Sequence, residues 1–174
     1  MARNGLKAAV FALLAINTAI FLSTGSLSEA LDSVAWLMLL VLFELETGGI
    51  ARTHGARIMK IVRALRLCAA AALVAALVGY ARSAEWADVT NVTLWCAVVG
   101  LLEFEVRWPA IFARHRAVFA AAAAFLYFGL ATLAGLWLWR GEWFDAYDAV
   151  LWLIAFATLE MDVLGFIARK GRAA

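Results

Sequence analysis

Six carboxylates inside long apolar stretches are the residues whose types and spacing suggest chemistry in this sequence. An acidic side chain near the centre of a membrane-spanning helix costs about 2.5 to 3.5 kcal/mol, so it is expected to be compensated or used. Intramembrane acids commonly mark ion or proton pathways. The candidate ion pathway therefore consists of three pairs, each with one residue between its members: Glu44 and Glu46, Glu103 and Glu105, and Glu160 and Asp162.

A polar seam leads to the first acid of each pair. A tryptophan precedes that acid by eight residues, and an Asp or Asn precedes the tryptophan by four. Steps of four residues stay on one face of a helix. The second acid, two positions further on, points roughly 200° away and must face a neighbouring helix or the cytoplasmic interface. The predicted seam residues are Asp32, Trp36, Asn91, Trp95, Asp148 and Trp152.

The inner acids allow two interpretations. In the first, they form salt bridges that hold helices together, and Glu103 has a candidate partner four residues further on. In the second, Glu44, Glu103 and Glu160 converge as a ring that binds a cation or relays protons. Oxygen ligands alone favour Ca²⁺, Mg²⁺ or Mn²⁺, but the sequence leaves any metal unassigned, and no cofactor beyond such a cation is expected. The candidate charge partners are Arg57, Arg63, Arg66, Arg107 and Arg169.

The acidic stretches belong to an internal repeat. Residues 84–106 align without a gap with residues 141–163, so that tryptophans and carboxylates fall in the same columns, and residues 25–47 carry a fainter copy. Repetition of one unit predicts repeated structure. We expect three pseudo-repeats, covering roughly residues 1–56, 57–115 and 116–174.

The elements that must position these residues are apolar. Hydrophobic residues make up 66% of the 174 residues, and the mean hydropathy of +0.89 lies outside the soluble globular class. Because unpaired backbone groups cannot face lipid, each segment long enough to cross the bilayer should be a helix. Asn17 and Thr18 in the first helix are expected to hydrogen-bond to a neighbour. The sequence predicts an all-α membrane protein with one transmembrane domain over residues 1–174, whose six spans form three antiparallel hairpins: residues 6–23, 31–50, 61–81, 89–108, 117–139 and 146–168.

The distribution of basic residues predicts the orientation. Of the 15 Lys and Arg residues, only Arg82 and Arg140 fall on one side of these spans, and basic loops face the cytoplasm. Both termini are therefore expected there. The run ARIMKIVRALRL, with basic residues three apart, resembles the charged helix of voltage-sensor domains. Because it lies at the cytoplasmic mouth and no pore signature follows, we interpret it as a basic collar that meets anionic lipid headgroups.

These features predict a cation or proton channel or transporter that uses intramembrane carboxylates. The alternative is a non-catalytic membrane subunit or scaffold, whose acids and arginines hold helices or a partner together. Enzymatic activity is not expected, since no nucleophile, metal-ligand set or cofactor motif accompanies the acids. Partners would be the lipid bilayer and either further copies of the chain or another membrane subunit, with no nucleic acid. The expected location is a bacterial inner membrane; the transported ion and its direction stay open.

Overall fold

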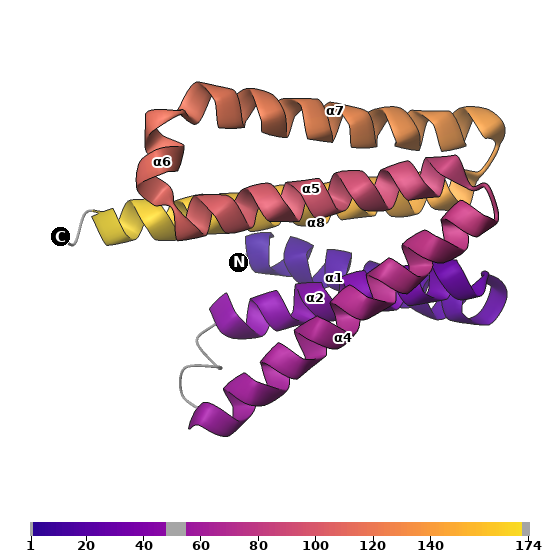
Figure 1. Cartoon of the computed structure of the whole chain (residues 1–174), viewed down its shortest axis with the longest axis horizontal. Helices are drawn as coiled ribbons and strands as arrows, with labels where there is room; N and C mark the ends of the chain where they lie inside the picture. Colours follow the sequence, from indigo (N-terminus) through magenta and orange to yellow (C-terminus); the bar gives the residue numbers. More distant parts are fainter. Residues whose placement is uncertain (1, 48–54, 172–174) are drawn as a thin grey trace. The chain divides into compact units, whose positions relative to one another are not determined.

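The computed structural model describes residues 2–47 and 55–171, and every regular element in these ranges is an α-helix (Figure 1). Within them, the side chains of residues 2–4, 46–47, 55–57, 106 and 159–171 lie outside the description. The all-α prediction is confirmed for this part of the chain. Its seven helices are α1 (Ala2–Thr24), α2 (Leu27–Thr47), α4 (Gly55–Arg82), α5 (Trp86–Arg107), α6 (Pro109–Arg114), α7 (Arg116–Arg140) and α8 (Trp143–Gly171).

Four of the described helices are long and apolar enough to cross a membrane, which supports the assignment as a membrane protein. They contain the spans Gly5–Thr24, Ile58–Arg82, Trp86–Glu105 and Arg116–Arg140. The acid-bearing helices α2 and α8 are not among the spans found in the described residues. In α2 the cause is plain, because acids near both of its ends leave only a short uncharged stretch between them.

The chain divides into two compact units, residues 15–92 and residues 1–14 with 93–174. In the first, α2 packs along α4. The two helices come close at Gly79, where an added Cβ would overlap the Ser28 hydroxyl and lie 3.3 Å from the Ser28 Cβ. Small residues at such a crossing let helix backbones come close. A buried cluster of Ala76, Tyr80 and Val92 lies in the same unit.

The unit of residues 1–14 and 93–174 contains α7 packed against α8 and linked to α5 by side-chain contacts. A Cβ added at Gly129 of α7 would come within 3.1 Å of Leu94 on α5. The rings of Phe104 on α5 and Phe119 on α7 stack with centroids 5.2 Å apart. These contacts make α5, α7 and α8 neighbours.

The turns after α4 and α7 share part of their backbone hydrogen bonding. Ala84 and Gly141 both adopt positive φ, at 58° and 80°, and they occupy the same column of the sequence repeat. The next amides, of Glu85 and Glu142, donate to carbonyls five residues back, each at 2.9 Å. The carbonyls of the same two glutamates then accept the first bonds of α5 and α8, each at 3.1 Å. Such a left-handed residue ends one helix and reverses the chain within a few residues.

The fourth predicted segment ends one residue too late, and a short helix follows α5. α5 ends at Arg107, and α6 starts at Pro109. Proline cannot donate a backbone hydrogen bond and disfavours helical geometry in the residue before it. Trp108, with φ −127° and ψ 58°, accordingly leaves the helix. The other ends differ by several residues in places, as at the start of α4, because a helix need not stop where the hydrocarbon core ends.

Candidate functional site

The seam on α2 faces the protein interior. Trp36 and Leu40 are buried at 6% and 4% exposure. The Asp32 Oδ1, Trp36 Nε1 and Glu44 Oε1 atoms are buried as well. On the opposite side of the same helix, Val41 and Leu45 are exposed. α2 therefore turns its polar stripe inward and its aliphatic stripe outward, which suits a helix surrounded by lipid.

The acid at the start of α2 has a structural role of its own. The Ser26 amide donates to the Glu29 carboxylate, and the Glu29 amide donates to the Ser26 hydroxyl at 3.3 Å. This reciprocal pair is a capping box, which satisfies amides that the first turn of a helix leaves unbonded. Glu29 therefore serves as a helix cap and is not part of the seam.

The seam on α5 is buried near the start of the helix and exposed near its end. Near its start, the Asn91 Oδ1 is buried and accepts no hydrogen bond from the described residues. Trp95 follows, at 4% exposure. Further on, the Glu103 side chain is 47% exposed, and the Arg107 Nη2 lies 2.9 Å from its Oε2. The predicted local pair does form, so Glu103 is a compensated carboxylate at the end of the span rather than a buried one.

The seams of α5 and α8 meet. The Trp95 ring packs on the Phe156 ring with centroids 4.5 Å apart, and Trp152 lies 6.3 Å from the same phenyl ring. Trp152 and Phe156 are buried. In α8, Asp148, Trp152, Phe156 and Glu160 are spaced by four, so the contact places two predicted stripes side by side.

The remaining predicted residues divide into described and undescribed side chains. Glu105 and Arg66 are partly buried, Asp148 is partly buried, and Arg63 is exposed. The side chains outside the described part are those of Glu46, Arg57, Glu160, Asp162 and Arg169. Whether Glu44, Glu103 and Glu160 form one ring therefore stays a prediction.

Tyr80 is a residue of the site that sequence reasoning missed. Its side chain is 3% exposed, beside Ala76 and Val92. Four carboxylates near the starts of α2 and α5 interact electrostatically with its hydroxyl: Asp32, Asp88, Glu29 and Glu85. A lone tyrosine near a helix end gives no sequence signal of this, because these carboxylates come from outside its own helix.

Asn17 and Thr18 of α1 are also buried, at 3% and 6% exposure. Two adjacent polar residues in the middle of an apolar span are a detectable signal, and burial inside protein is what such a pair needs in a membrane. Among the described residues no three His, Cys, Asp or Glu side chains are grouped so that they could hold a metal ion.

Comparison with known proteins supplies no functional assignment, so the function is inferred from the geometry. No protein-family model, curated protein sequence or solved structure matches the chain.

Proposed function

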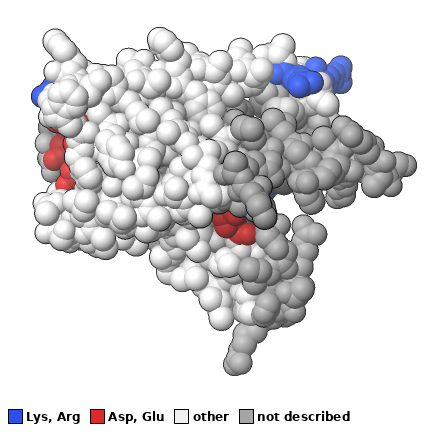
Figure 2. All heavy atoms as spheres, turned by 180° about the vertical axis from the view of Figure 1, so that it is seen from behind, with Lys and Arg blue, Asp and Glu red and all other residues white. Residues whose placement is uncertain are grey.

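We propose that the chain is a six-span protein of a bacterial inner membrane, built from three pseudo-repeated hairpins with both termini in the cytoplasm. Four described apolar helices support the membrane location. The matching turns at Ala84 and Gly141 support the repeat of the second and third hairpins. Among the residues that Figure 2 describes, most of those seen on this face are uncharged, which suits contact with lipid. The excess of basic residues on one side supports the orientation.

The proposed function is translocation of protons or small cations along the carboxylate seams. The observation that carries it is the inward stripe of α2, on which carboxylate atoms of Asp32 and Glu44 are buried at the two ends of an uncharged stretch of the helix. A buried carboxylate is costly in a membrane and is commonly found where an ion or proton passes. Glu44 is the proposed carrier, since a carboxylate can bind a proton or a cation and release it.

The other seam residues have supporting roles in this proposal. Asp32, near the start of α2, would exchange ions with the outer solution. Glu103, exposed and held by Arg107, would lie at the inner mouth of its helix. Trp95 and Phe156 hold α5 beside α8. No covalent step is involved, so we propose no enzymatic activity.

A scaffold is the second candidate, and the Glu103 to Arg107 ion pair favours it. That pair compensates one of the six acids locally, as an interior that only holds helices together would do. Exposed pairs of this kind contribute about 0.3 to 0.5 kcal/mol, so the pair alone is weak support. Under either candidate, further copies of the chain or another membrane subunit could complete the assembly, and the inner face would contact anionic headgroups.

Flux measurements separate the two candidates. Protein reconstituted in liposomes is exposed to a proton gradient and then to gradients of Na⁺, K⁺, Mg²⁺ and Ca²⁺, with empty liposomes as the control. The proposal predicts protein-dependent flux of protons or at least one cation. If the protein is folded and the flux of every ion equals that of empty liposomes, translocation is contradicted and the scaffold becomes the better candidate.

A further inference from the structure

The connection between α5 and α7, residues 108–115, lies at the membrane surface. It joins two of the candidate spans, Trp86–Glu105 and Arg116–Arg140. Consecutive spans must be joined on one face of the bilayer. α6 occupies this joint and runs across the ends of α5 and α7 rather than along them (Figure 1).

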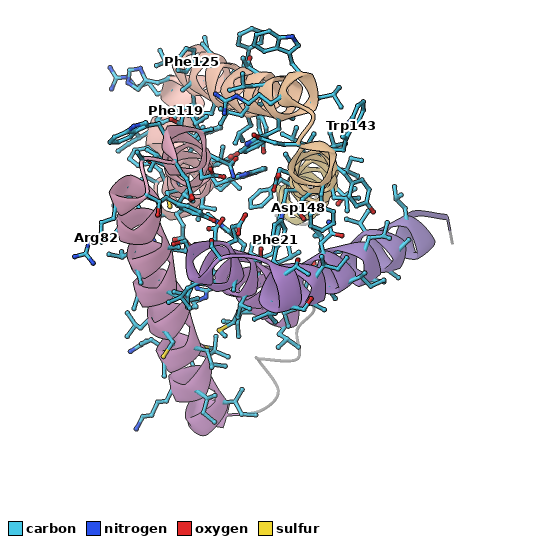
Figure 3. The ribbon with its side chains drawn as sticks, turned by 90° about the vertical axis from the view of Figure 1, so that its right-hand side faces the viewer. Phe21, Arg82, Phe119, Phe125, Trp143 and Asp148 are labelled. Carbon is cyan, nitrogen blue, oxygen red and sulfur yellow. The ribbon has the colours of Figure 1, made fainter. Side chains whose placement is uncertain are left out.

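Four aromatic rings fix α6 to its neighbours. Phe104 of α5 contacts Trp108 with centroids 4.9 Å apart and stacks on Phe119 of α7 at 5.2 Å. Phe112 of α6 stacks on the same Phe119 at 4.9 Å. Figure 3 shows Phe119 on the side of α7 that faces α5. Ring packing therefore ties α6 to α7 through Phe112, and the residue before α6, Trp108, to α5.

Backbone hydrogen bonds at His115 fix the corner between α6 and α7. The His115 amide donates to the carbonyls of Ile111 and Phe112, each at 3.1 Å. Its carbonyl accepts from Val118 at 2.9 Å and from Phe119 at 3.2 Å. The residues on either side of this corner are consequently presented in a defined direction.

The exposed side chains of this connection are both basic and apolar. Trp108 and Ile111 are 48% and 47% exposed. Arg114 and Arg116 are exposed, and neither forms an ion pair with a described side chain. Arg107, by contrast, has Glu103 as its partner. This short stretch of chain therefore carries an exposed indole, an exposed aliphatic side chain and two exposed arginines that form no ion pair with a described side chain.

We propose that α6 with its flanking arginines is a binding site for the headgroup of an anionic phospholipid. Guanidinium groups bind phosphate oxygens through paired, charge-assisted hydrogen bonds. An indole at the level of the headgroups anchors a segment at the interface. This site goes beyond ion translocation, and it rests on the proposed function only in that α5 and α7 cross the bilayer.

The test measures lipid affinity with purified protein in detergent. Phosphatidylglycerol is titrated while thermal unfolding is followed, with phosphatidylcholine and soluble glycerol phosphate as parallel ligands. The test variant is Arg114→Gln with Arg116→Gln, and the matched control is Arg140→Gln, an exposed arginine at the other end of α7. An arginine near an anionic headgroup is worth about 1 kcal/mol, which is about fivefold in affinity, so the double variant should bind roughly 25-fold more weakly.

The proposal expects that loss for phosphatidylglycerol alone, with Arg140→Gln binding as the wild type does and Arg114→Lys with Arg116→Lys recovering part of the affinity. Unchanged affinity in the double glutamine variant would overturn it. Equal loss in Arg140→Gln would also overturn it, since net charge would then explain the effect. Saturable binding of soluble glycerol phosphate with the same affinity would replace the lipid by a free phosphate ligand. Because the readout is binding, absence of ion flux would leave this result unaffected.

Discussion

The indole ring of Trp95 on α5 packs against the phenyl ring of Phe156 on α8, with centroids 4.5 Å apart and planes inclined by 37°. Both residues stand on stripes that lead to inner acids, Glu103 on α5 and Glu160 on α8. The contact joins the fourth and sixth predicted spans, which are separated in the chain by α7. It is the structural basis for expecting the two seams to act together.

Truncating this contact should loosen the bundle. We expect Trp95→Ala to lower the free energy of unfolding by about 3 to 5 kcal/mol, because a buried aromatic ring is lost and a cavity is left. The matched control is Trp139→Ala, since Trp139 is 84% exposed where Trp95 is 4% exposed. Unfolding by denaturant in detergent or bicelles measures both. Equal effects of the two substitutions would contradict the packing described here.

The two left-handed turn residues predict opposite responses to exchange. Gly141→Ala should destabilise the protein by about 1 kcal/mol, because a Cβ is strained at positive φ. Ala84→Gly should relieve the same strain and raise stability slightly. Gly100→Ala is the control, since an added Cβ meets nothing within 4 Å there, and alanine favours a helix interior. Thermal unfolding measures the stability of the three variants. A loss of stability in Ala84→Gly would contradict the left-handed geometry of this turn.

The crossing of α2 and α4 predicts a coupled pair. Gly79→Ala should cost about 1 to 3 kcal/mol, because the new methyl group collides with the Ser28 hydroxyl. Ser28→Ala in the same chain should restore part of the loss, which a double-mutant cycle would report as a coupling energy. Gly135→Ala on α7, with open space around it, should be harmless. Additive effects of Gly79→Ala and Ser28→Ala would mean that the two helices do not meet at this point.

The apolar runs were sufficient to predict the long helices, and on α2 atoms of Asp32, Trp36 and Glu44, which the spacing assigns to one face, are all buried. Both follow from local geometry: helix rise and the step of four residues. The short helix α6 was missed, although Pro109 marks its start, because six residues between two long apolar runs carry no periodic signal.

The contacts between helices could not be predicted from the sequence. The repeat aligns Trp95 with Trp152, and the Trp95 ring packs on that of Phe156, one turn further along α8. Such a shift between helices depends on side-chain fit, which periodicity does not encode. The burial of Tyr80 has the same origin, since Val92 of α5 and Leu31 of α2 belong to its cluster. The exposure of Glu103 beside Arg107 likewise distinguishes it from Glu44, although the repeat places the two in one column.

The most direct test of ion translocation compares Glu44→Gln with Glu85→Gln in the flux measurement on reconstituted protein. Each substitution removes one carboxylate charge, but Glu44 has a buried carboxylate oxygen, whereas Glu85 is exposed at the start of α5. The account predicts that Glu44→Gln reduces proton or cation flux to the level of empty liposomes while Glu85→Gln conducts as the wild type does, with both variants folded. Wild-type flux through folded Glu44→Gln would contradict it.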